Sequence, residues 1–243
     1  MQSIQTVSEN TIYVGASDRR LAKFENLFPI PRGVSYNAYV ILDEKTALLD
    51  TADASVGAQF LENVAAALDG RKLDYLIVDH MEPDHAAMIE AVLVRWPDLR
   101  LVVNAKTLPM LKMYFPTDSA VIDDALVVKE GDTLDLGKHK LTFVMAPMVH
   151  WPEVMMTFDT TTGTLFSADA FGTFGALEGA LFADEVDFAG KWLDPPLLHQ
   201  HCGQVRRAGA GCAEKGRHPA HRDHCPAARS RVAQEPGLVH WQV

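Results

Sequence analysis

Long hydrophobic runs, a basic charge balance and a disulfide framework are all missing from this 243-residue sequence. No apolar stretch approaches the roughly 20 residues that a membrane-spanning helix needs, so we expect no membrane contact. Acidic residues outnumber basic ones by 32 to 22, which argues against a nucleic-acid partner because phosphate binding requires a basic surface. The N-terminus lacks the basic start and apolar core of a secretory signal, and three cysteines do not suggest exported disulfides. The sequence therefore predicts a cytoplasmic protein.

Cysteine, histidine and charge are distributed unevenly along the chain. Six of the ten histidines lie beyond residue 198, and seven basic residues face only three acidic ones from residue 195 onward. All three cysteines lie in the same segment, at Cys202, Cys212 and Cys225. We therefore predict a folded domain over residues 1–194 and a poorly packed tail over residues 195–243.

The first 115 residues alternate between apolar runs typical of strands and segments with helical spacing. The expected strands span residues 11–15, 37–42, 46–51, 72–80 and 100–105, and the expected helices span residues 54–70, 86–97 and 106–115. Between residues 125 and 171 the pattern changes to closely spaced strands separated by Gly and Asp turns, which predicts an antiparallel run. The combination indicates an α/β protein built from mixed layers.

A polar cluster, VDHMEPDH at residues 78–85, follows one of the predicted buried strands. In an extended segment alternate side chains share a face, so His80, Glu82 and Asp84 can point into one pocket. Asp84 and His85 need a turn to converge. Imidazole and carboxylate groups at this spacing, attached to a rigid strand, favour a metal site over a solvated loop.

Two further predicted strands end in metal-competent residues. His150 follows the run VMAPMV, and Asp169 follows TLFS. Each alone would be read as a cap or a turn residue, and Asp50 is interpreted in that way or as a support for a ligand. Three polar strand ends together predict one site at the rim of a multi-stranded scaffold.

The type of ligand bears on the identity of the metal. The candidate ligands are three imidazoles and three carboxylates, with no cysteine among them: His80, His85, His150, Glu82, Asp84 and Asp169. Such a set can hold two ions with an aspartate as bridge, and it suits iron or manganese at least as well as zinc.

At these motifs the sequence resembles the flavodiiron proteins, also called A-type flavoproteins. The resemblance rests on H-x-E-x-D-H at residues 80–85, HWPE at 150–153 and SADAFG at 167–172, with support from the segment 31–51. It covers residues ~8–194. The more general metallo-β-lactamase motif has His where this chain has Glu82, so Glu82 favours a diiron centre over a zinc hydrolase.

The resemblance implies a metallo-β-lactamase-like αβ/βα sandwich with two non-haem irons. It implies that His80, Glu82 and His150 bind one iron and that Asp169 bridges to the second. Asp84 and His85 would serve the second iron, although His85 is not always a direct ligand in the family.

The resemblance also implies an activity and partners. Family members reduce O2 to water, NO to N2O, or both, in the cytoplasm. Their electrons come from FMN in a C-terminal flavodoxin-like domain. Rubredoxin or a similar carrier supplies electrons to this FMN. They form homodimers or homotetramers in which the FMN reaches the diiron site of the partner subunit.

The tail departs from the family pattern. The family pattern has one more His for the second iron, followed by the flavodoxin domain, and this sequence matches neither. We therefore expect no FMN-binding residues in this sequence. Reading permitted codons one nucleotide later gives RRYYINIVGKYG, APLHGPV and NLGWFIGKY in order, which resemble family text. We therefore predict that residues 195–243 are a frameshifted segment, that the chain is truncated in effect, and that its activity and oligomerisation are impaired.

Three alternatives stay open at this point. The tail could be a genuine Cys/His zinc-binding segment, although its spacings match no common zinc finger. The chain could be a zinc-dependent hydrolase of the metallo-β-lactamase superfamily. It could also be an inactive metal-binding remnant.

Overall fold

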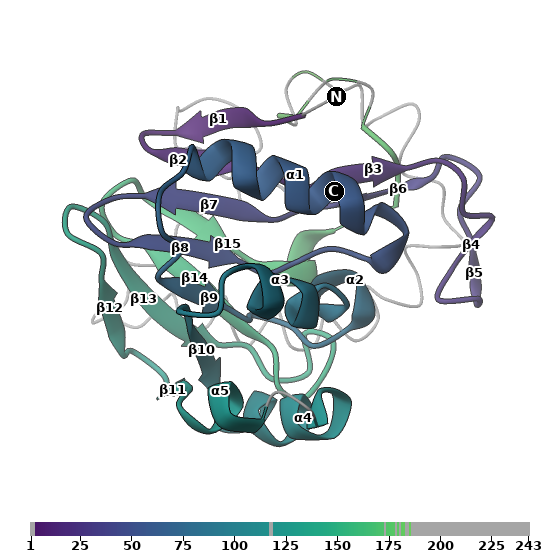
Figure 1. Ribbon diagram of the computed structural model, residues 1–243. Coiled ribbons are helices and arrows are strands. Elements are labelled where there is room, and N and C mark those ends of the chain that lie inside the picture. The colour runs from purple at the N-terminus through teal and green to yellow at the C-terminus, as the bar shows by residue number, and fades with distance from the viewer. Residues whose placement is uncertain are drawn as a thin grey trace, which may run out of the picture.

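The computed structural model of this chain contains two main β-sheets, one of seven strands and one of four (Figure 1). The structure describes residues 3–116, 119–172, 174–177, 179, 181, 182 and 185. Within these residues no helix has the length and apolar character needed to cross a membrane.

The larger sheet has seven strands in the order β1-β2-β7-β8-β9-β10-β11. Strands β1, β2, β7 and β8 pair antiparallel in that order, whereas β8, β9, β10 and β11 are parallel neighbours. The strands are β1 (Gln5–Ser8), β2 (Thr11–Tyr13), β7 (Tyr39–Leu42), β8 (Thr46–Leu49), β9 (Tyr75–Ile77), β10 (Arg100–Asn104) and β11 (Leu126–Val128). The parallel half is rich in buried Val, Ile and Leu, as expected for strands covered on both faces.

The second sheet is an antiparallel run of four strands, as the turn-rich sequence predicts. These strands are β12 (Thr133–Asp135), β13 (Lys140–Met145), β14 (Met155–Asp159) and β15 (Thr164–Phe166). Two small ribbons join β3 (Ala16–Asp18) to β6 (Val34–Tyr36) and β4 (Lys23–Phe24) to β5 (Phe28–Pro29).

Helices lie along one face of the larger sheet (Figure 1). They are α1 (Gly57–Leu68), α2 (Pro83–Ala86), α3 (Ile89–Arg95), α4 (Thr107–Tyr114) and α5 (Ser119–Asp123), with short 3-10 turns η1 (Ala54–Val56) and η3 (Ala168–Phe171). In α1 the residues Phe60, Val64 and Leu68 recur at helical spacing and are fully buried, so this face packs on the sheet. The helix ends where Asp69 and then Gly70 adopt positive φ angles of 46° and 80°, a left-handed stop.

The opposite face of the larger sheet packs against the second sheet. Ile41 and Ile77 from the first sheet lie in one apolar cluster with Leu141 and Phe143 from the second, and all four are fully buried. Each such side chain contributes on the order of 1.5–3 kcal/mol through removal from water. The sandwich therefore fixes the two sheets relative to each other.

This packing brings several strand ends to one edge. Parallel strands β8, β9 and β10 end at the same edge. Asp50 and Asp79, which follow β8 and β9, therefore lie at the same edge as Asn104, the last residue of β10. The backbone N–H of Met155, at the start of β14, donates to the carbonyl of Asp79 at 3.0 Å and joins the second sheet to this edge. Polar groups from both sheets consequently meet at one rim.

The structure corrects some expected boundaries. The sequence predicts β11 as part of the antiparallel run, but this strand pairs parallel to β10 in the larger sheet. The strand predicted over residues 72–80 is confined to Tyr75–Ile77, because the residues after it turn into the polar loop. The tail over residues 195–243 lies outside the described residues.

Candidate metal centre

The loop after β9 carries four of the six predicted ligands. The Asp79 N–H donates to Asp50 Oδ1 at 2.7 Å, which ties the start of the loop to the end of β8. Helix α2 then begins at Pro83, a favourable first helical residue because proline lacks an N–H that could not be paired there. The single turn of α2 separates Glu82, which precedes it, from Asp84 and His85 within it, and supplies the turn that these two residues require.

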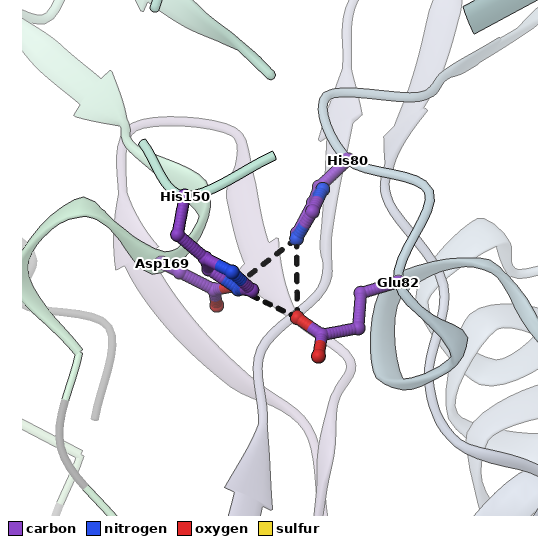
Figure 2. A group of neighbouring side chains, drawn as sticks. All are labelled: His80, Glu82, His150 and Asp169. Carbon is purple, nitrogen blue, oxygen red and sulfur yellow. Dashed lines mark hydrogen bonds and ion pairs between the residues drawn. The ribbon is translucent and has the colours of Figure 1, made fainter. Parts of the chain in front are cut away.

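Glu82, His80, His150 and Asp169 converge on one point, as Figure 2 shows. We call these four the first group. Their candidate ligand atoms all lie within 4.8 Å of one another. His80 Nε2 lies 3.2 Å from Glu82 Oε2 and 3.2 Å from Asp169 Oδ2. His150 Nε2 lies 2.7 Å and 3.1 Å from the same two oxygens. Two imidazole nitrogens and two carboxylate oxygens thus surround a common centre.

Asp84, His85 and Asp169 form a second set of candidate ligand atoms, also within 4.8 Å of one another. We call these three the second group. His85 Nε2 lies 2.9 Å from Asp169 Oδ1 and 3.6 Å from Asp84 Oδ2. Asp169 therefore belongs to both groups and presents a different oxygen to each.

Asp169 reaches this position from the second sheet. It follows β15 on the 3-10 turn η3, after Ala168 in a left-handed conformation with φ of 46°. His150 enters from the loop between β13 and β14. The three polar strand ends predicted from the sequence are therefore close together, and all six predicted residues lie in one cluster.

Hydrogen bonds between unlike groups perturb the first group strongly. Burial acts against the charge on Glu82, but hydrogen bonds from His150 and His80 outweigh it and lower the pKa of Glu82 to about 2. Burial likewise disfavours the charged form of His150, yet bonding to Asp169 and Glu82 raises its pKa to about 9. Burial also acts against a charged His80, but bonding to Asp169, Glu153 and Glu82 raises the pKa of His80 well above its usual value, so both rings favour the protonated form when no metal is bound.

The second group behaves differently. Burial raises the pKa of Asp84 to about 7; the nearby charge of His85 only partly offsets it. Burial also disfavours a charged His85, but the carboxylates of Asp84 and Asp169 raise its pKa well above the ordinary value.

The donor set fits metal cations. Buried carboxylates are costly unless a cation or a hydrogen-bond donor compensates them. In the described part of the chain, the buried Oδ1 of Asp84 has no hydrogen-bond partner, although its side chain faces the cluster. Hard oxygen and imidazole donors suit first-row divalent ions. An ion in each group would satisfy these atoms and replace the protons on the histidines.

Supporting contacts lie behind the histidines. For Asp50 such a role is among the sequence expectations, whereas the sequence predicts none for Glu153. His80 Nδ1 lies 2.8 Å from Glu153 Oε1, and His85 Nδ1 lies 2.9 Å from Asp50 Oδ2. Asp79 accepts a hydrogen bond from Thr157 Oγ1 at 2.8 Å. Burial and the nearby charge of Asp50 raise the pKa of Asp79 well above its usual value. The only sequence signal for these roles was the position of acids at strand ends.

A mixed α/β sandwich with a two-part cluster of imidazoles and carboxylates at its rim defines the metallo-β-lactamase-like class. The model of one family in this class, the ODP family of beta lactamases, matches residues 34–214. The chain belongs to that family.

Flavodiiron proteins are prominent among the similar proteins. Anaerobic nitric oxide reductase flavorubredoxin from Klebsiella pneumoniae is 38% identical over 183 residues, which are 74% of this chain and 37% of that protein. The solved structure of rubredoxin oxygen:oxidoreductase from Desulfovibrio gigas is 29% identical, with a TM-score of 0.72, over 86% of this chain and 48% of that one. A mutant flavo di-iron protein from Thermotoga maritima is 26% identical, with a TM-score of 0.77, over 89% and 54%.

These comparisons confirm the predicted fold class and the resemblance. They also set its extent: the chain spans 37% of the length of the flavorubredoxin that it matches and about half of each solved chain.

Proposed function

We propose that this chain is the diiron domain of a flavodiiron-type oxidoreductase that reduces NO to N2O, O2 to water, or both. The observation that carries the proposal is the two-sided contact of Asp169, with Oδ2 toward His80 and His150 and Oδ1 toward His85. A carboxylate in that position can bridge two ions. The similarity to proteins named as nitric oxide and oxygen reductases supports the same reading.

In this proposal His80, Glu82 and His150 hold the first ion, Asp84 and His85 hold the second, and Asp169 bridges them. A pair of ferrous ions held by these residues would supply two electrons to a small substrate. Conversion of two NO to N2O and water consumes two electrons and two protons, which matches that capacity. Reduction of O2 to two waters consumes four of each, so it requires an outside electron supply.

The residues of this chain determine access and orientation. The Trp151 ring stands edge-on to the rings of His80 and His150, with centroids 5.4 Å and 6.2 Å apart, and so covers this side of the first group. The Asp169 side chain is 25% exposed, the most open of the first-group ligands, so small gases and protons reach the cluster beside it. Glu82 Oε2 lies within hydrogen-bonding distance of Nε2 of both His80 and His150, so it orients these two nitrogens toward the centre.

Glu82 favours iron over zinc in this site. An oxygen donor replaces the third imidazole that a zinc hydrolase of this class would use, and carboxylate suits iron or manganese. The predicted alternative of a zinc hydrolase has no comparable support among the similar proteins named above.

Anaerobic loading of the full chain with Fe²⁺, followed by NO, tests the proposal. We expect N2O in proportion to bound iron pairs, measured by gas chromatography, and none from chain loaded with Zn²⁺. Absence of N2O from the ferrous protein, together with ester or thioester hydrolysis by the zinc protein, would favour the hydrolase instead.

The whole-protein context is part of the proposal. We infer that FMN from another domain or chain delivers the electrons, that a rubredoxin-type carrier supplies the FMN, and that the protein works in the cytoplasm. The boundary near residue 194 and the frameshifted tail stay predictions. An unshifted nucleotide sequence through this region, with no flavodoxin-coding segment after it, would overturn the frameshift.

A further inference from the structure

Two histidines of the cluster each contact a buried carboxylate through the ring nitrogen that faces away from the centre. Glu153 Oε1 lies 2.8 Å from His80 Nδ1, and Asp50 Oδ2 lies 2.9 Å from His85 Nδ1. Because the Nε2 atom of each ring faces the cluster, the Nδ1 atom carries the proton when a metal is bound, and Nδ1–H donates a hydrogen bond to the carboxylate. The first and second groups therefore have separate supports.

The Glu153 carboxylate contacts His80 from a buried position. The residue is 1% exposed, and its Oε1 also accepts the backbone N–H of Met81 at 3.1 Å. Asn104 Nδ2 donates to the backbone carbonyl of Glu153 at 2.6 Å and fixes the segment against β10. Among the described residues, nothing hydrogen-bonds the buried Oε2 atom. The donors from His80 and Met81 thus both act on Oε1.

Asp50 is placed in a denser network. Its Oδ2 contacts His85, and its Oδ1 accepts the backbone N–H of Asp79 at 2.7 Å. Both oxygens are therefore hydrogen-bonded, and the charge is spread over donors on each side. The two histidines are supported by carboxylates that differ in how far their charge is neutralised.

We propose that Glu153 is a positioning residue that sets the metal affinity and the reduction potential of the first group through His80, independently of the second group. A carboxylate that accepts a hydrogen bond from Nδ1–H makes the imidazole a more basic ligand at Nε2. A more basic ligand stabilises the more highly charged ferric ion, so the first iron acquires a lower reduction potential. The part of the proposal that concerns iron rests on the diiron function proposed above.

Replacement of the charge alone provides the test. Glu153→Gln can keep an oxygen at the Oε1 position for both donors while it removes the negative charge. The matched comparison is Asp50→Asn, the same acid-to-amide change behind the other histidine. Affinity is measured with Co²⁺ in the full chain, in an Asp84→Asn background in which the second group is disabled.

In that background we expect Glu153→Gln to weaken Co²⁺ binding by about 10–100-fold, the range found when an outer-shell partner is removed. We expect Asp50→Asn, which reaches the first group only through His85 and Asp169, to weaken it clearly less than Glu153→Gln. In the otherwise unaltered chain loaded with iron, we expect Glu153→Gln to raise the reduction potential of one iron. Unchanged affinity and potential in Glu153→Gln, or equal losses in both variants, would overturn the proposal.

Two controls separate this inference from folding and from the proposed function. If Glu153→Gln does not fold, Glu153→Asp, which keeps the charge but withdraws it from Nδ1 by one methylene, is measured instead, with the same expected weakening and the same overturning result. The Co²⁺ comparison does not depend on turnover. A chain that makes no N2O, yet shows the affinity difference, would contradict the proposed function and support the role of Glu153.

Discussion

The Oδ1 atom of Asp169 lies 2.9 Å from Nε2 of His85, while the other oxygen of the same carboxylate faces His80 and His150. Asp169 lies on the turn that follows the second sheet, whereas His80 lies in the loop that leaves the first sheet and His85 in the helix α2 after it. A single side chain therefore joins the two sheets and the two groups of candidate ligands.

Removal of the shared carboxylate should abolish the paired site. In Asp169→Asn one anionic donor disappears from both groups, so we expect the metal content to fall from two ions per chain to one or none. Elemental analysis after reconstitution and desalting measures this. The control is Asp98→Asn, an exposed acid-to-amide change, which should retain two ions. Full retention of two ions by Asp169→Asn would show that the residue is not a bridge.

The side chain at position 82 should govern metal preference. Glu82→His replaces an oxygen donor by a third imidazole in the first group, which shifts the set toward the one typical of zinc hydrolases. When equal Fe²⁺ and Zn²⁺ compete anaerobically, we expect the zinc fraction bound to rise several-fold relative to the unaltered chain. Glu62→His, at an exposed position of α1, should leave the ratio unchanged. An unaltered ratio in Glu82→His would remove the argument for iron.

Metal uptake should release protons and strengthen with pH. In the metal-free protein, contacts with Asp169 and Glu82 raise the pKa of His150 to about 9, so the ring is protonated at neutral pH. A bound ion displaces that proton, and the apparent affinity should therefore increase from pH 6.5 until about pH 9. Calorimetric titration in buffers of different ionisation enthalpy reports the released protons. Uptake that releases none and does not vary with pH would contradict the assigned protonation.

The same histidine affects the stability of the metal-free chain. Because its pKa is raised on folding, protonated His150 stabilises the fold fully below its ordinary pKa of about 6.5. This contribution is lost as the pH rises through about 9. Denaturant unfolding without metal should show a smaller pH-dependent loss over that window in His150→Gln than in the unaltered chain. An identical loss in both proteins would exclude His150 as its source.

The interface between the sheets should dominate stability away from the cluster. Phe143 is fully buried between the two sheets, so Phe143→Ala should lower the free energy of unfolding by about 3–5 kcal/mol. Met113 is 74% exposed on α4, and Met113→Ala should change it by less than about 0.5 kcal/mol. Chemical denaturation of the metal-free chain measures both. Comparable effects of the two substitutions would contradict the described packing.

The sequence predicted the principal parts of the cluster because its chemistry is local. His80, Glu82, Asp84 and His85 lie within six positions, and the expected strand ends brought His150 and Asp169 to the same rim. Strand pairing was harder to predict. The apolar run of β11 gives no sign of its direction, and its parallel pairing with β10 depends on how the chain crosses over after α4.

The support of His80 could not be predicted for a related reason. Glu153 follows His150 closely in the sequence, yet it contacts His80, 73 positions away. Only the packing of the second sheet against the first places it there. Asp50 was interpreted as a turn or supporting residue, and the structure distinguishes these by its 2.9 Å contact with His85.

Mössbauer spectroscopy of the full chain reconstituted with ⁵⁷Fe tests the central claim most directly, because it counts the irons and shows whether they are coupled. In the oxidised protein we predict two ferric ions per chain whose spins cancel through the shared Asp169 carboxylate, so that quadrupole doublets without magnetic splitting persist at low temperature. A single iron per chain, or magnetically split spectra of isolated ferric ions, would contradict a bridged diiron centre.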